Sequence, residues 1–234
     1  MKFVHARVTP PRSLMELCAH HSGGQGVALA PADRDVFMKI GRWVREYLCQ
    51  PHEALGREGS VCPYAKPSLT AGLLHVGICW IDGLDDPRPE MLRVMLETLD
   101  GCEARAPVDG KRSSLKATLM VFPGAAQEVI DEIHEELGVA FARRGFMLGE
   151  FHPESMKTGL RGPSIYPLRS PVPLLGIRRM VLGDFEFLIH SPERLALYAE
   201  RFGDAGQRLI RAYREAARLL DPLASSMPEA RASL

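Results

Sequence analysis

The segment from His152 to Pro173 constrains the fold of this chain more than any other, because five of its 22 residues are proline. Proline fixes φ and removes a backbone donor, so neither a helix nor a central strand can run through the segment. A long irregular segment inside a compact domain is usually functional or disordered. Disordered segments contain few aromatic residues and few large apolar residues, yet Leu160, Ile165 and Tyr166 occur here. We therefore expect an ordered, rigid loop that presents polar groups to an anionic or polar ligand.

His152 directly follows an apolar stretch that reads as a strand. A histidine at a strand end beside a loop is well placed to bind a metal or haem iron, or to act as a general base. The alternative is a loop histidine hydrogen-bonded to the backbone. The arginines of this region suit bidentate recognition of a carboxylate or phosphate, with solvated salt bridges as the alternative. The candidate ligand-binding residues are Glu154, Ser155, Arg161, Tyr166, Arg169 and Ser170. Arg178 and Arg179 follow in a strand and should face opposite sides.

A second irregular segment, residues 52–72, contains Cys62-Pro63-Tyr64. A residue before proline favours an extended backbone, which can expose the Cys62 sulfur as a haem ligand or a nucleophile. The alternative is a buried, inert cysteine. Tyr64 could stack on a ligand and hydrogen-bond through its hydroxyl. If the two irregular segments meet, Cys62 and His152 could form a cofactor-free thiol or acid–base site.

Composition restricts the class of protein. Lysine plus arginine and aspartate plus glutamate number 29 each, so net charge gives no argument for nucleic acid or an anionic membrane. The five cysteines are irregularly spaced without a CxxC, which argues against a disulfide framework or structural zinc. The first residues lack an apolar core of signal-peptide length, and the longest apolar run is too short to span a membrane. We expect a reduced, cytoplasmic location and one domain, with 1–32 irregular, 33–220 as core and 221–234 flexible.

Hydrophobic periodicity predicts the order of helices and strands. Helices are expected over Asp33–Cys49, Arg88–Leu99, Ala125–Arg144, and from Ser191 to about Leu220 with a break near Gly203; strands are expected over Leu73–Asp82, Lys116–Phe122, Phe146–Phe151, Leu174–Val181 and Phe185–His190, the last two as a hairpin through Gly183-Asp184. This order favours an α+β fold, a mostly antiparallel sheet covered by helices on one face. A doubly wound α/β sheet is the alternative.

Three motifs resemble a known family: SVCPYAKPSL (60–69), HPESMKTGLRGP (152–163) and YPLRSPVPLLGIRRMVLGDFEFL (166–188). They are similar to a bacterial and fungal family catalogued as a domain of unknown function, often encoded near natural-product genes, and the resemblance covers roughly residues 33–220. More remotely, the CPYA element and the chain length resemble the YqcI/YcgG group. Some members of that group are haem-dependent enzymes that N-hydroxylate arginine-like substrates.

We expect, first, a haem-dependent oxygenase of specialised metabolism that acts on a small amino-acid or guanidino substrate. His152 would be the iron ligand, Tyr64 would line the pocket, and Arg169 and Arg161 would bind a propionate or a substrate carboxylate. The second hypothesis is a non-catalytic module that binds a small anionic ligand or a partner protein. The third is the cofactor-free enzyme that uses Cys62 and His152. Nucleic acid and membrane are not expected partners, and the sequence leaves the oligomeric state open.

Overall fold

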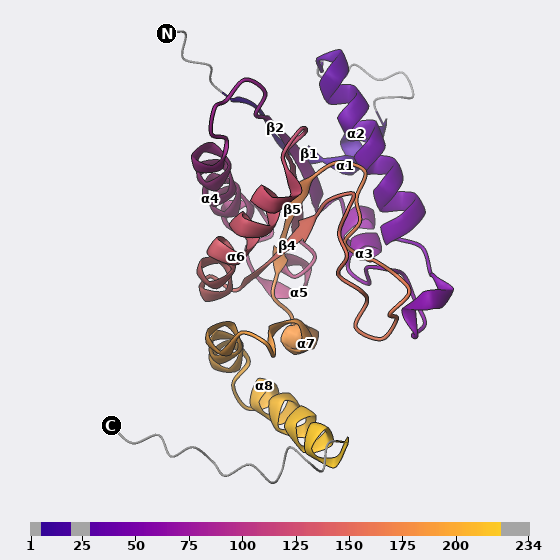
Figure 1. Cartoon of the computed structure of the whole chain (residues 1–234), viewed down its shortest axis with the longest axis vertical. Coiled ribbons are helices and arrows are strands. Elements are labelled where there is room, and N and C mark those ends of the chain that lie inside the picture. The colour runs from indigo at the N-terminus through magenta and orange to yellow at the C-terminus, as the bar shows by residue number, and fades with distance from the viewer. Residues whose placement is uncertain (1–5, 20–28, 221–234) are drawn as a thin grey trace. The chain divides into compact units, whose positions relative to one another are not determined.

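The computed structural model describes residues 6–19 and 29–220, and Figure 1 shows how their helices and strands are arranged. The expectations for His5, His20–Gly26 and the tail after Asp221 lie outside the described residues. By its internal contacts the chain divides into two compact units, Met1–Met180 and Val181–Leu234, and each is described by itself. Within the described ranges, no helix has both the length and the apolar character needed to cross a membrane.

In the described part of the larger unit, a five-stranded sheet forms the centre. Its strands are β1 (Arg7–Ser13), β2 (Leu74–Trp80), β3 (Ala117–Val121), β4 (Phe146–Phe151) and β5 (Leu174–Arg179). Their spatial order is β1-β2-β3-β5-β4. The β2–β3 pair is parallel, and the other three pairs are antiparallel. The α+β class with a mostly antiparallel sheet is therefore confirmed.

Helices cover both faces of the sheet rather than one (Figure 1). One layer holds α1 (Leu14–Ala19), α2 (Pro31–Trp43), its π-helical continuation η2 (Val44–Leu48) and α3 (Ala65–Thr70); the other holds α4 (Arg88–Ala104) and α6 (Gln127–Arg143). Side chains alternate along a strand, and β2 buries Val76 and Ile78 in the first layer but Cys79 in the second. A strand that is apolar on both sides needs a helical layer on each.

Strand β1 lies in the stretch that the sequence suggested would be irregular. Its central residues are Pro10 and Pro11, which made a strand improbable at the sequence level. The structure places it at the edge of the sheet, and the pairing with β2 shifts register between Thr9 and Arg12. Edge strands and bulges are the positions where a sheet tolerates proline, because no ladder donor is required there. The prolines thus identify an edge, not a loop.

The buried carboxylate of Asp33 ties β1 and β2 to helix α2. It accepts two hydrogen bonds from Arg7, at 2.9 and 2.8 Å, one from the Thr9 hydroxyl at 2.7 Å and one from the Trp80 indole at 2.7 Å. Burial pushes the pKa of Asp33 upward. The hydrogen bonds from Arg7, Thr9 and Trp80, together with the Arg7 charge, outweigh it and hold that pKa below 3.8.

The smaller unit is helical and corrects the predicted hairpin. Residues Phe185–Leu188 form the short helix α7, not a strand, after the 3-10 turn η4 (Leu182–Asp184). The buried Asp184 carboxylate accepts the Val181 backbone N–H at 2.8 Å, and this local bond closes a turn where a hairpin was expected. A short apolar run such as this one suits a strand or a buried helix equally. Helix α8 (Pro192–Leu220) has the predicted interruption at Gly203, where φ is 51°.

We predict that Asp33→Asn lowers the free energy of unfolding by about 2 to 3 kcal/mol at neutral pH, because buried donors lose a charged acceptor. A carboxyl whose native pKa is lowered stabilises the fold fully above its unfolded pKa and loses that contribution as the pH falls through the native value. The difference between wild type and variant should therefore shrink as the pH drops below the ordinary pKa of an aspartate toward the lower native value. Urea denaturation at a series of pH values measures it.

Asp35→Asn is the matched control, because Asp35 lies on the same helix and is exposed. Its effect should stay below about 0.5 kcal/mol at every pH. A pH-independent loss in the Asp33 variant would show that the carboxylate charge is not what holds the three elements together.

Candidate functional site

The two irregular segments meet backbone to backbone. A Cβ built on Gly162 would lie 1.8 Å from the Ala54 carbonyl oxygen, and one built on Gly56 would lie 2.3 Å from that of Arg161. Gly56, which follows the 3-10 turn η3 (Glu53–Leu55), also has a left-handed φ of 64°. Both positions therefore require glycine. The Cys62–His152 hypothesis required the two irregular segments to meet. They do meet, at these glycines.

Arg169 is engaged inside its own loop. Its Nε donates to the Ser155 carbonyl at 2.9 Å, and its guanidinium lies 4.0 Å from the centre of the Tyr166 ring. The Trp43 indole donates to the Arg169 carbonyl at 2.9 Å, and the Tyr47 hydroxyl donates to that of Tyr166 at 3.1 Å. A proline-rich loop has few ladder bonds of its own, so side chains supply the partners for its carbonyls.

The other candidates of this loop are divided between surface and interior. Glu154 and Arg161 are exposed, and Ser170 is buried with its hydroxyl donating to the Val172 carbonyl at 2.7 Å. The structure thus brings Ser155, Tyr166 and Arg169 together. Their use as a ligand site stays a prediction.

His152 is buried at the end of β4 and faces helix α6. Its Nε2 lies 3.6 Å from Asp131 Oδ1. In the described surroundings, its Nδ1 and the buried Ser155 hydroxyl have no hydrogen-bond partner. A carboxylate beside an imidazole is the arrangement that orients a general base.

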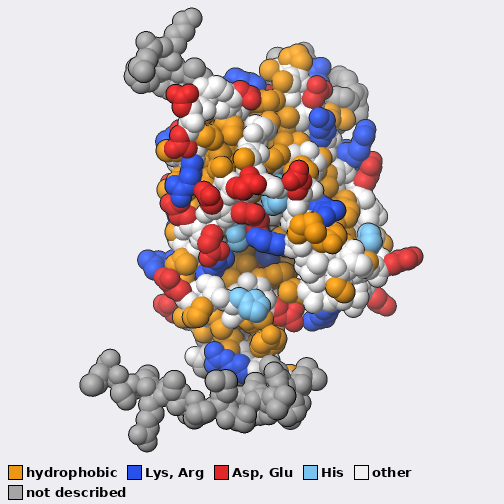
Figure 2. Space-filling view, viewed as in Figure 1, with side chains coloured by type: hydrophobic (Ala, Val, Ile, Leu, Met, Phe, Trp, Pro, Cys, Tyr) orange, Lys and Arg blue, Asp and Glu red, His pale blue; other side chains and the backbone are white. Residues whose placement is uncertain are grey.

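A chain of charges extends from Asp131 across the same end of β4. Lys157 lies 3.6 Å from Asp131 and forms an ion pair with the buried Glu150, whose other oxygen lies 3.0 Å from His134 Nε2. Burial alone would lower the pKa of Lys157, but the carboxylates of Glu150 and Asp131 raise it above its ordinary value. Figure 2 shows acidic side chains gathered with histidines near the middle of one face. Asp131 and Glu150 thus place two carboxylates, bridged by Lys157, at this end of β4.

The haem hypothesis depends on His152 and stays a prediction. An imidazole with one buried nitrogen that lacks a hydrogen-bond partner has the chemistry of an axial ligand. However, only 6% of the His152 side chain is exposed and its Nε2 faces a carboxylate. In the described ranges, no group of three or more histidines, cysteines and acids is arranged to hold a metal ion.

A shallow surface cavity of about 600 Å³, open to solvent and lined mostly by exposed residues, lies elsewhere, against the motif 60–69. This volume is in the range of small-molecule sites. Lys66 and Arg112 contribute positive charge, and Ser60 and Thr70 contribute hydroxyl groups. The complete lining is Ser60, Pro63, Lys66, Pro67, Thr70, Ala71 and Arg112. No acidic residue occurs among these described lining residues, so the cavity suits an anion.

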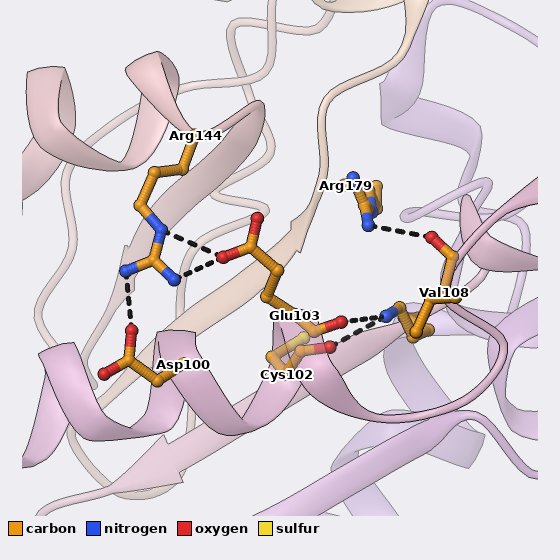
Figure 3. Close-up of polar contacts among 7 residues, drawn as sticks. Asp100, Cys102, Glu103, Val108, Arg144 and Arg179 are labelled. Carbon is orange, nitrogen blue, oxygen red and sulfur yellow. Dashed lines mark hydrogen bonds and ion pairs between the residues drawn. The ribbon is translucent and has the colours of Figure 1, made fainter.

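The segment that carries Arg112 is anchored at both ends. Arg112 lies on the short helix α5 (Gly110–Ser113), between α4 and β3. The fully buried Lys116 ammonium donates to three backbone carbonyls at the end of α4, at 2.8 to 3.1 Å. Arg179 donates to the Val108 carbonyl at 3.1 Å (Figure 3). These bonds hold the backbone on either side of Arg112, whose exposed side chain lines the cavity.

Cys62 and Tyr64 flank the cavity residue Pro63. Tyr64 lies under the Arg178 guanidinium, 4.5 Å from the ring centre to the cation. Arg179 lies on the other side of β5, 4.8 Å from the Phe146 ring, as the alternation along a strand predicts. Cys62 is half-buried and its carbonyl accepts the Ser60 hydroxyl at 3.0 Å. Cys62 and Tyr64 thus belong to the cavity region, whereas His152 belongs to the α6 side.

Sequence reasoning missed the two cavity cations and Asp131. Lys66 lies inside the motif 60–69, and this position was the one feature of the sequence that could have indicated its role. Arg112 comes from a turn between α4 and β3 without any motif of its own, and only the fold brings it to the motif. Asp131 is one of several acids on α6, and nothing in the pattern marks it as the one that faces His152.

The comparisons with known proteins give a family. The family described as a domain of unknown function (DUF6875) matches residues 37–213, and the chain belongs to it. This match includes the three motifs at 60–69, 152–163 and 166–188, and it confirms the resemblance drawn from them. Neither the curated proteins nor the solved structures contain a match to the chain. The remote similarity to the YqcI/YcgG group stays a prediction.

We predict that Gly162→Ala destabilises the protein by about 1 to 3 kcal/mol, because the added methyl group would overlap the Ala54 carbonyl and force the two segments apart. Equilibrium unfolding in urea measures the change. Gly101→Ala is the control, since a Cβ at Gly101 of α4 meets nothing within 4 Å. That variant should be stabilised by about 0.5 to 1 kcal/mol through helix propensity. Equal, small effects of both substitutions would contradict the close contact.

Proposed function

We propose that this protein binds a small molecule bearing a carboxylate or phosphate group, in the cavity formed by residues 60–71 and Arg112. The observation that carries the proposal is the lining itself: two cations, two hydroxyl groups and apolar side chains line one open depression of about 600 Å³. This conclusion favours the anion-binding hypothesis over the other two. It relocates the expected cations from Arg161 and Arg169 to Lys66 and Arg112.

The chemistry of the lining defines the ligand class. Arg112 can bind a carboxylate or phosphate through two parallel hydrogen bonds, and Lys66 adds a compact charge. The Thr70 hydroxyl can donate a further hydrogen bond, whereas the Ser60 hydroxyl already donates to the Cys62 carbonyl and can only accept. Pro63, Pro67 and Ala71 offer an apolar wall. A ligand with an anionic head and a small apolar body complements both parts, and an amino-acid-like molecule belongs to this class.

The surroundings support binding by a pre-organised site. The bonds made by Lys116 and Arg179 fix the connection that carries Arg112. On the opposite wall, Ala65 and Ser68 of α3 are buried, which holds that short helix against the sheet. Side chains on a fixed backbone lose less freedom when a ligand binds, so more of the interaction energy appears as affinity.

Two substitutions test the proposal. Arg112→Ala and Lys66→Ala should each weaken the binding of citrate or pyrophosphate by about 10- to 100-fold, the range expected for losing a charged hydrogen bond. Isothermal titration at fixed ionic strength measures the affinity. Thermal unfolding with the same anions provides a second readout, because a ligand bound only by the native state raises the melting temperature.

The chain offers matched controls. Lys111 is the exposed neighbour of Arg112 on α5, and Lys39 is an exposed lysine on α2; neither lines the cavity. Lys111→Ala and Lys39→Ala should leave the affinity within about twofold of wild type, because salt screens the attraction between the anion and exposed cations that do not contact it. Equal losses in test and control variants would show non-specific attraction and refute the site. The visible absorption spectrum after addition of haem tests the haem hypothesis separately.

A further inference from the structure

Cys49 and Cys62 lie beside each other where two segments of the chain meet. Pro51 and Ser60 form an isolated antiparallel bridge, and Val61 N donates to the carbonyl of residue 50 at 2.8 Å. Beyond this pair the ladder ends, because Cys49 has helical backbone angles, φ −87° and ψ −3°, and Cys62 N donates instead to the carbonyl of residue 48 at 2.9 Å. This bond to the carbonyl directly before Cys49 brings the two cysteines close to the Cα separation of about 4.4 to 6.8 Å that a disulfide requires.

The two thiols differ in exposure and share one environment. Both cysteines are free, Cys49 is buried and Cys62 is half-buried, and both belong to the core layer around α2 and η2. Burial raises the pKa of the Cys49 thiol, the neighbouring Cys62 raises it further, and Lys66 acts in the opposite direction. The electrostatic effect of Cys62 on Cys49 agrees with the closeness of the two residues that the backbone bonds show. Cys62 is the thiol that a solvent-borne oxidant reaches first.

We propose that Cys49 and Cys62 form a reversible dithiol–disulfide couple that reacts with peroxides. In the first step the Cys62 thiolate attacks one oxygen of hydrogen peroxide, the O–O bond breaks, and hydroxide leaves and is protonated to water. Cys62 is then a sulfenic acid. In the second step the Cys49 sulfur attacks the Cys62 sulfur, the S–O bond breaks, and the oxygen leaves as water with the Cys49 proton. Two thiols are oxidised to one disulfide while one peroxide is reduced to two waters.

The disulfide would join the end of η2 to the segment that begins the 60–69 motif. Segments 48–51 and 60–62 are already held by backbone bonds, so the bond can form without a large movement of the backbone. The proposed dithiol couple is independent of the anion site, because it depends on the backbone bonds between segments 48–51 and 60–62 and on the exposure of Cys62. It does not depend on Lys66 or Arg112.

The test is peptide mapping after peroxide treatment. Trypsin leaves Cys62 and Cys79 on one peptide, because Lys66 and Arg88 precede proline, so the experiment uses the Cys79→Ala background. We expect one cross-link between peptides 46–57 and 58–93, in monomeric protein, reversed by dithiothreitol. Cys102→Ala, which removes a buried cysteine of the other core layer, should not change the cross-link.

A second variant keeps the proposal falsifiable. In Cys49→Ala, Cys62 has no resolving thiol, so dimedone should trap its sulfenic acid about tenfold more than in protein that retains Cys49. Circular dichroism confirms that the variant is folded. Equal dimedone labelling of Cys62 with and without Cys49, cross-links only between molecules, or no reaction of Cys62 would each overturn the couple.

Discussion

The close approach of two irregular segments at Gly56 and Gly162 is the constraint on which the rest of this structure depends. These segments carry motifs on which the resemblance to the family was drawn, and neither contains a long helix or strand. Their backbones touch at distances that exclude any side chain at Gly162. Leu55 and Ile165 then join the same core layer as Val76 of the sheet. The motif that lines the cavity is therefore held by tertiary packing, and its geometry is as rigid as the core beneath it.

Regular elements could be predicted from the sequence where the periodicity is strong. Strand β4 has the predicted bounds, and α6 begins and ends within two residues of its prediction. Two kinds of information were missing. The prolines of β1 indicate a loop in the sequence, because the sequence does not show that this strand lies at the edge of the sheet, where proline is tolerated. The apolar run at Phe185 fits a strand or a helix equally, and the Asp184 bond to Val181 decides the outcome.

The sequence motif beside the candidate site could be recognised from the sequence, but the charged residues that line the site could not. The sequence identified Cys62 and Tyr64, and the cavity lies beside them at Pro63. It also suggested Arg169 as a ligand group, and this stays a prediction, because the bond that its Nε donates to the Ser155 carbonyl leaves the use of the exposed guanidinium untested. Arg112 comes from a distant turn that Lys116 and Arg179 fix in place. Such a contribution depends on the path of the whole chain, so no local pattern reveals it.

The measurement that tests the central claim most directly is a titration of the ¹⁵N-labelled protein with pyrophosphate, followed by amide chemical shifts. Binding in the cavity predicts saturable shifts that concentrate at Ser60–Ala71 and Gly110–Ser113 and that disappear in Arg112→Ala. Shifts that concentrate instead around His152 and Arg169 would place the ligand in the proline-rich loop. Those shifts, or the absence of any saturable shift, would contradict the account.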